Sequence, residues 1–219
     1  MHLGEMFDPE YLWDKFLQQE FDERSVEETM AIMVKEPFVN HVPTMTGGTG
    51  QEQVSQFYLY QFITNNPDDT TIERVSRTVG ANSLVDEFVL CLSHTQQINW
   101  LRCSKLPGVP PTGKRLRIPC TAVVHFRGDR IFEEHISWDL ATVLVQLGLL
   151  PKWLPFAYAL PDGAVPAPGH HFEYRVPAIS IECAEKFQDI HSRLSNDMIN
   201  YGLPPSKMAK YDIRQKKDD

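Results

Sequence analysis

The chain has 219 residues, of which 42% are hydrophobic, and it carries 21 lysines and arginines against 29 acidic residues. This composition suits one folded domain with an appendage and excludes wholesale disorder. The net charge of −8 argues against general nucleic-acid binding, which needs clustered cations. There is no apolar run of about 20 residues and no secretory signal, so we expect a cytoplasmic protein without membrane contact. There is no CxxC pair either, so we expect reduced thiols.

The acidity is concentrated at the start of the chain, because residues 1–36 carry ten acidic and three basic side chains. Two helix starts lie there, Asp8-Pro9-Glu10 and the capping box at residues 25–28. The second helix is expected to carry Met33 and to end before Pro37. The first helix has apolar residues at helical spacing, so we expect the acidic side chains of both helices to lie mostly on their solvent faces. Its apolar residues are Leu12, Trp13, Phe16, Leu17 and Phe21.

The glycine-rich residues 47–50 are followed by Gln-Glu-Gln, whereas a phosphate loop needs Lys and Ser or Thr there. We therefore interpret them as a flexible turn before a third helix with Val54, Phe57, Tyr58 and Phe62 on one face.

Strand-like patterns follow, with β-branched residues and alternating polarity. The strand at residues 83–95 is apolar on both faces, so both of its faces should be covered. A last helix begins at the capping residue Asp139 and ends at Gly148. Helices followed by a mostly antiparallel sheet predict an α+β fold with helices packed on one face of a curved sheet. The predicted strands span residues 71–80, 83–95, 115–127 and 130–138.

The C-terminal part differs in composition, since six of the sixteen prolines fall within residues 151–177. Proline excludes a regular helix or a central strand there, so we expect an extended arm. One helix is predicted within residues 180–200. The expected division is a compact domain at residues 8–150 and an arm with a terminal helix at residues 151–219.

The segment GDRIFEEHISWD followed by LATVLVQLGLL resembles the end of the SnoaL-like polyketide cyclases, in the nuclear transport factor 2-like superfamily. The phrases VNHVPTMTGG, LPGVPPTGKR and EEHISWD are similar to a subgroup often grouped with dienelactone hydrolases. That grouping implies no hydrolase chemistry, because the Gly-x-Ser-x-Gly elbow is absent. The resemblance implies a cone with an apolar pocket, a homodimer formed through the sheet, and acid–base catalysis without metal or organic cofactor.

In the polyketide cyclases, the catalytic Asp lies three residues before the Asp that opens the final helix. That position is Ile136 here, and isoleucine cannot take a proton. Two replacements are open. Glu134 shares a strand face with Ile136 and Trp138, and His135 would face the pocket only if a bulge shifted the register. A histidine side chain can change charge near neutral pH, which suits proton transfer.

Further candidates lie on other elements. His94 ends a strand face that also carries Asp86, and it could contact a ligand or only a backbone group. Asn40 and His41 follow the helices in a segment that lines the pocket of related enzymes. The remaining candidates each have a structural alternative: Tyr58 and Trp138 as core packing, and Asp139 as a helix cap.

These observations favour a small cofactor-independent enzyme that transfers protons on an apolar carbonyl or polyketide-like compound, by aldol cyclisation, isomerisation or elimination. The resemblance to polyketide cyclases points to secondary metabolism. His135 or Glu134 would remove the proton, and His94 or His41 would stabilise the enolate. The alternatives are a non-catalytic ligand-binding or dimerisation module, and an epoxide or lactone hydrolase.

Overall fold

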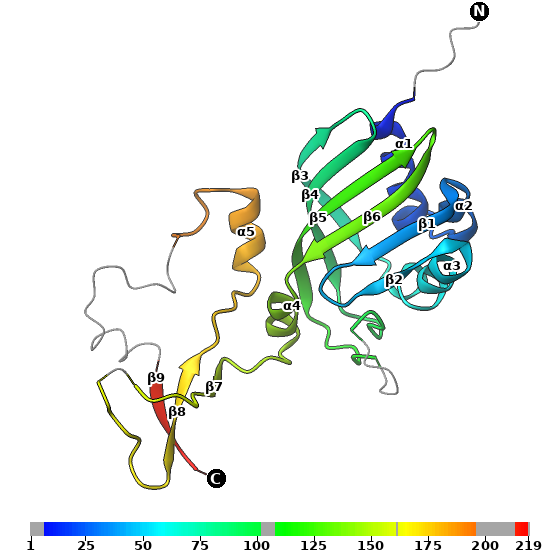
Figure 1. Cartoon of the computed structure of the whole chain (residues 1–219). Coiled ribbons are helices and arrows are strands. Elements are labelled where there is room, and N and C mark those ends of the chain that lie inside the picture. Colours follow the sequence, from blue (N-terminus) through cyan, green and yellow to red (C-terminus); the bar gives the residue numbers. More distant parts are fainter. Residues whose placement is uncertain (1–6, 102–107, 161, 196–212, 219) are drawn as a thin grey trace, which may run out of the picture.

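The structure, a computed structural model, describes residues 7–101, 108–160, 162–195 and 213–218. A six-stranded curved sheet in the order β2-β1-β6-β5-β4-β3 forms the main body (Figure 1). The strands β1 and β6 pair parallel and the other neighbours pair antiparallel. The strands are β1 (Met33–His41), β2 (Thr46–Thr49), β3 (Thr71–Val79), β4 (Ser83–Ser93), β5 (Arg115–Arg127) and β6 (Arg130–Trp138).

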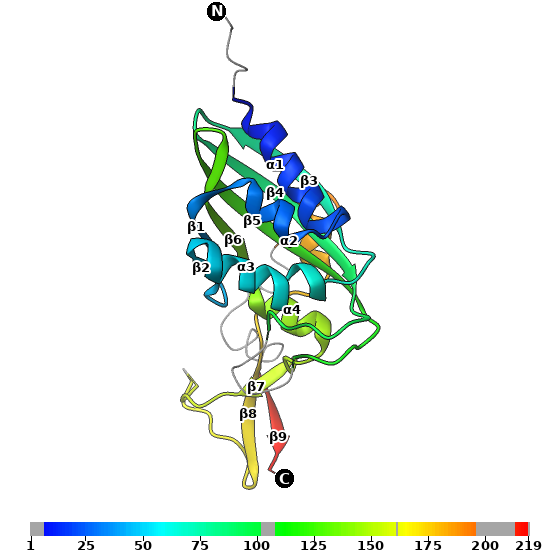
Figure 2. The same cartoon turned by 90° about the vertical axis from the view of Figure 1, so that its right-hand side faces the viewer.

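The N-terminal helices cover one face of this sheet (Figure 2). They are α1 (Pro9–Leu17), a π-helical turn (Gln18–Asp22), α2 (Val26–Ala31) and α3 (Gly50–Tyr60), which a short 3-10 turn (Ile63–Asn65) follows. After β6, Asp139 caps α4 (Leu140–Leu147), and the left-handed Gly148 ends it. The predicted α+β architecture is confirmed, and β3 to β6 lie within one or two residues of the predicted strands.

A buried ion pair fixes α1 to the sheet. The Trp13 indole N–H donates to Asp86 on β4 at 2.9 Å, and the Arg77 guanidinium donates to the same carboxylate at 2.6 and 2.8 Å. Trp13 also stacks on Phe16 with ring centroids 5.1 Å apart. The helix therefore has a defined position over the sheet, which sets where its following turn enters the core.

The second predicted helix is too long, because α2 ends at Ala31 and Met33 begins β1. Pro37 lies inside that strand, and the pairing of β1 with β6 shifts register between Met33 and Phe38. A proline cannot donate a ladder hydrogen bond, so it fits where the pairing is irregular. The predicted turn at residues 47–50 is also wrong in part, since Gly47 and Gly48 belong to the edge strand β2.

A second irregularity determines which side chains of β6 point inward. The pairing of β5 with β6 passes from His125–Glu133 to Phe126–Ile131, which leaves Phe132 as an extra residue. Ile131, Glu134 and Ile136 are buried, whereas Phe132 lies partly exposed below the Arg127 guanidinium. The bulge precedes Glu133, so the alternation from Glu133 to Trp138 keeps the phase that the sequence predicts.

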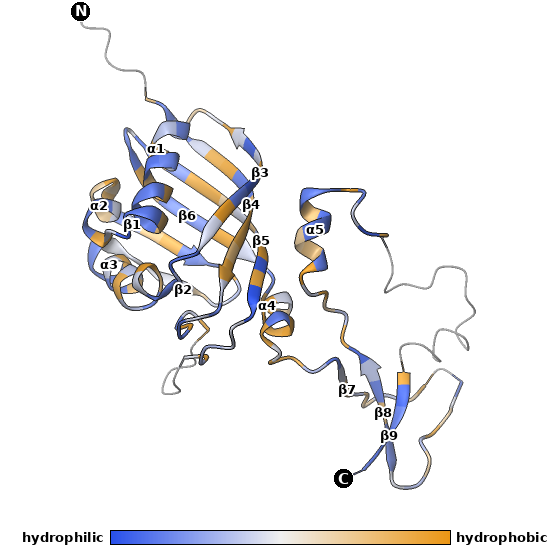
Figure 3. Cartoon of the chain, turned by 180° about the vertical axis from the view of Figure 1, so that it is seen from behind, coloured by the Kyte–Doolittle hydropathy of each residue, from blue (hydrophilic) through white to orange (hydrophobic). Residues whose placement is uncertain are grey.

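The outer face of the sheet is covered in part by α5 (Glu182–Gln188). Ala184 and Cys91 are fully buried in this contact, and Arg117 donates to Glu73 beside it at 2.7 Å. The strand predicted to be covered on both faces is therefore β4, with the cone's core on one side and α5 on the other. In Figure 3, which is coloured by hydropathy, hydrophobic residues lie next to one another on neighbouring strands of the sheet.

The C-terminal arm contains a small second sheet of β7 (Trp153–Pro155), β8 (His170–Arg175) and β9 (Ile213–Lys217). The expectation that residues 151–177 hold no central strand is wrong, because β8 lies between the other two. β8 contains no proline, so all of its residues can donate hydrogen bonds to a neighbouring strand on either side.

The predicted C-terminal helix is shorter than expected. It ends at Gln188, and Ile190 and Leu194 are exposed instead of forming an apolar stripe, while residues 196–200 lie outside the described part of the chain. None of the helices in the described ranges is long and apolar enough to cross a membrane.

Candidate active site

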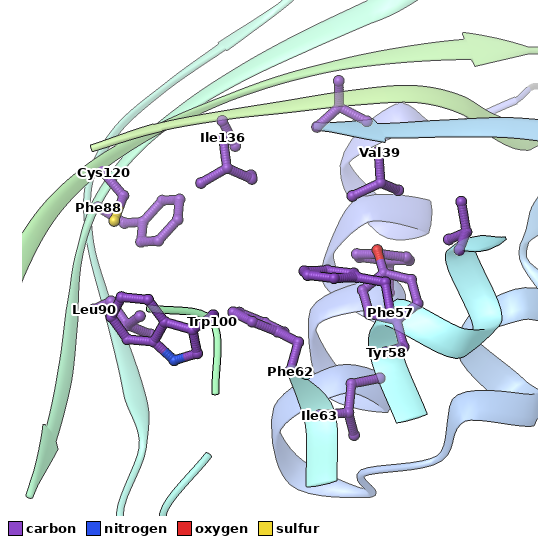
Figure 4. Packing of buried hydrophobic residues seen from close by; sticks show 14 of the residues in the cluster. Val39, Phe57, Tyr58, Phe62, Ile63, Phe88, Leu90, Trp100, Cys120 and Ile136 are labelled. Atoms are coloured by element: carbon purple, nitrogen blue, oxygen red, sulfur yellow. The ribbon is translucent and has the colours of Figure 1, made fainter. Parts of the chain in front are cut away.

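A partly enclosed cavity lies between the sheet and the N-terminal helices. About 40 Å³ of it is open to the centres of water molecules, which is room for about three waters or a compact group. In Figure 4 the side chains of Phe62, Phe88, Trp100 and Ile136 surround this space. The lining residues are Trp13, Leu17, Glu20, Phe21, His41, Phe62, Phe88, Leu90, Trp100, Ile118, Cys120, Glu134, Ile136 and Trp138.

Glu134 is the acid that β6 presents to the cavity. Its residue is 3% exposed, and the Tyr58 hydroxyl of α3 donates to its Oε2 at 3.0 Å. Ile136, in the position where the resembling enzymes have aspartate, lines the same cavity. The carboxyl group therefore enters the cavity two residues earlier on the same strand face, as the alternation of β6 requires.

Glu20 is a second acid in the cavity, and it is an exception to the expectation that the acidic residues of the first helices lie mostly on solvent faces. It is 5% exposed and lines the cavity. It lies in the middle of the π-helical turn, whose Glu23 N–H donates to the Gln18 carbonyl at 3.0 Å. Such turns occur often at functional sites. Among the described residues none donates a hydrogen bond to the Glu20 side chain, so its carboxyl group is available to a ligand.

The two carboxyl groups differ in how readily they ionise. Burial raises the pKa of Glu134 from 4.5 to about 7, while the Tyr58 hydrogen bond partly opposes that rise. Burial raises the pKa of Glu20 well above its ordinary value, and the negative charge of Glu134 raises it further. Glu134 therefore begins to ionise near neutral pH, and its charge makes Glu20 the harder of the two groups to ionise.

His41 at the end of β1 is the third titratable group in the cavity. It is 6% exposed and lies against Phe57 and Phe62, with ring centroids 5.1 and 5.0 Å away. Burial lowers its pKa to about 4, so the imidazole is neutral at physiological pH. It can donate or accept a hydrogen bond there, but it brings no positive charge.

Two predicted residues lie on the opposite face of the sheet. His135 contacts Glu133 at 2.8 Å and Asn40 at 3.4 Å, and neither His135 nor Asn40 lines the cavity. The bulge that could have turned His135 inward falls at Phe132, before Glu133. The alternation of the strand therefore separates His135 from the acid–base groups.

Other candidates have structural surroundings. His94 is fully buried, and its Nδ1 lies 2.9 Å from the Thr112 hydroxyl, outside the cavity lining. Asp86 is held by Trp13 and Arg77 as described above. Asp139 accepts from the Ala141 and Thr142 N–H groups as the cap of α4.

Of the remaining predicted residues, Tyr58 reaches the site through Glu134, and Trp138 lines the cavity while packing edge-on against Trp100 at 5.2 Å. The structure thus brings together Glu134, His41, Tyr58 and Trp138. Among the residues that the structure describes, no group of three His, Cys, Asp or Glu side chains is arranged to hold a metal ion.

The sequence did contain an indication of Glu20. Trp13, Phe16 and Leu17 mark the buried face of the first helix, and Glu20 follows at the next position of the same face. A charged residue at a buried position of an apolar stripe is unusual and therefore informative. Because residues 1–36 carry ten acidic side chains, Glu20 does not stand out among them by composition alone.

No model of a known protein family and no curated protein matches the chain. Solved structures do. A candidate polyketide cyclase from Acidithiobacillus ferrooxidans matches with a TM-score of 0.51 and 18% identity, over 68% of this chain and 98% of that one. AclR, a candidate hydroxylase from Streptomyces galilaeus, matches with a TM-score of 0.50 and 14% identity, over 65% and 85%. The chain therefore has the cone-shaped α+β fold that its resemblance to the SnoaL-like polyketide cyclases implied.

Proposed function

We propose that this protein is a small acid–base enzyme that moves a proton at a carbon atom next to a carbonyl group. The observation that carries the proposal is the pair of buried carboxyl groups in one apolar cavity, of which Glu134 ionises near neutral pH while burial and the charge of Glu134 favour the protonated form of Glu20. Pairs of groups whose surroundings drive their pKa values apart are typical of acid–base sites.

In the proposed reaction the Glu134 carboxylate removes the proton from carbon, and the C–H electron pair moves into the bond towards the carbonyl. The carbonyl oxygen takes up the developing negative charge and receives a proton from the Glu20 carboxyl. The Tyr58 hydroxyl holds Oε2 of Glu134, which leaves Oε1 for the substrate. Neutral His41 offers a further hydrogen bond to the oxygen. The product is an enol, which isomerisation, aldol closure or elimination can consume.

The test is hydrogen–deuterium exchange of simple ketones in D₂O, followed by NMR. Cyclohexanone and butanone are incubated with the protein, because exchange next to the carbonyl reports proton removal without knowledge of the natural substrate. We expect exchange above the buffer rate, a loss of at least about 100-fold in Glu134→Gln, and a smaller loss in Glu20→Gln.

Glu133→Gln is the matched control, since it changes the neighbouring carboxylate on the outer face of the same strand. It should leave the exchange rate unchanged. No exchange with any small ketone, or equal rates in Glu134→Gln and the wild type, would count against catalysis and favour a ligand-binding module.

A further inference from the structure

The charges in the cavity are unbalanced. Two acids line it, and no lysine or arginine does among the described residues, while His41 is too well buried to be protonated near neutral pH. Arg77, whose partner Asp86 contacts the lining residue Trp13, is already paired with Asp86 and Asp14. A buried carboxylate without a cation is costly, and none of the described side chains that line the cavity supplies one, so a ligand with a positive charge would be favoured there.

The rest of the lining suits one kind of cation. Six aromatic side chains surround the cavity: Phe88, Trp100 and Trp138 come from the sheet and the segment after β4, and Trp13, Phe21 and Phe62 come from the helical side. Aromatic rings attract alkylated ammonium groups through their negatively charged faces, and they cannot satisfy a strongly hydrated metal ion. The enclosed space holds a group of a few heavy atoms, which is the size of a methylated ammonium head.

We propose that the ligand of this cavity carries an alkylammonium group, which lies among the aromatic side chains and balances the charge of Glu134. This proposal rests on the proposed function and narrows its substrate class to an amine-bearing carbonyl compound. During proton transfer the negative charge passes from Glu134 to the substrate oxygen and then, with the proton that Glu20 gives up, to Glu20, so it stays in the cavity, where a substrate cation offsets it. An anionic ligand would meet repulsion instead.

The test compares choline with its uncharged isostere 3,3-dimethylbutan-1-ol, which replaces the nitrogen by carbon at the same shape. Dissociation constants are measured by NMR titration at pH 6 and pH 8. We expect choline to bind about tenfold or more tightly than the isostere at pH 8, and the preference to shrink at pH 6. Tyr58 contacts Glu134, and Glu20 and His41 line the same cavity. Burial keeps the charges of Tyr58 and His41 constant in this range, and it raises the pKa of Glu20 as it raises that of Glu134, so a rise in pH can only add negative charge to the cavity.

Glu134→Gln should abolish the preference for choline at pH 8 while leaving the affinity for the isostere within about twofold. The outer-face variant Glu133→Gln should keep the preference. Equal affinities, tighter binding of the isostere, no saturable binding of choline at millimolar concentration, or an undiminished preference in Glu134→Gln would each overturn the proposal. The titration needs no turnover, so it can fail while ketone exchange persists, and exchange can fail while choline still binds.

Discussion

Replacing Glu134 by glutamine should change how the stability of the protein depends on pH. In the unfolded chain this carboxyl group ionises near 4.5, whereas in the folded protein burial raises its pKa to about 7. The folded state therefore holds a proton that the unfolded state has lost between these two values. The free energy of unfolding should fall as the pH rises through this window and level off above it.

The size of the effect follows from the shift. Each pKa unit corresponds to about 1.4 kcal/mol, so the rise from 4.5 to about 7 corresponds to roughly 3 kcal/mol lost between pH 4.5 and pH 8. Glutamine has nearly the same shape and cannot ionise, so the variant should not lose this contribution. Glu20 responds in the same direction as Glu134, and its remaining contribution should persist in the variant.

The assay is urea unfolding followed by tryptophan fluorescence, which is sensitive here because Trp13, Trp100 and Trp138 line the cavity. Free energies of unfolding are measured at pH 5 and pH 8 for the wild type, Glu134→Gln and the outer-face control Glu133→Gln. The difference between the two pH values should be smaller in Glu134→Gln by on the order of 3 kcal/mol, and unchanged in the control. The same pH dependence in Glu134→Gln and the wild type would refute the assigned burial and protonation of this carboxyl group.

Three further outcomes follow from the same contacts. Tyr58→Phe removes the donor that stabilises the Glu134 carboxylate, so the pH midpoint of ketone exchange should move upward, and an unchanged or lower midpoint would contradict that hydrogen bond. Asp86→Asn leaves the Arg77 guanidinium without its buried counter-charge and should lower the free energy of unfolding by about 3 kcal/mol in a urea titration. A decrease of less than about 1 kcal/mol would mean that the pair is solvated. Ala184→Leu places a larger side chain in the buried contact of α5 with the sheet, so limited proteolysis should release the arm faster while ketone exchange stays unchanged. Equal cleavage rates would show that α5 does not depend on a small residue at this contact.

The sequence by itself determined most of the cone. Alternation along residues 130–138 placed Glu134 and Ile136 on the inner face, and the two-sided apolar pattern of residues 83–95 indicated a doubly covered strand. These features depend on the period of the side chains along a strand, which the residues themselves carry. The capped ends of α4 were equally readable, because Asp139 and Gly148 act on their own backbone.

Only the tertiary structure decided which titratable groups meet. His135 lies outside because the bulge falls at Phe132, ahead of the regular alternation from Glu133 to Trp138, and the position of a bulge depends on the pairing with β5. Glu20 enters the cavity because a π-helical turn follows a helix that Asp86 and Arg77 hold against the sheet. The contacts of that helix with the sheet join residues more than sixty positions apart, so a local pattern cannot supply them. The perturbed pKa values of Glu20 and Glu134 arise from that same long-range burial.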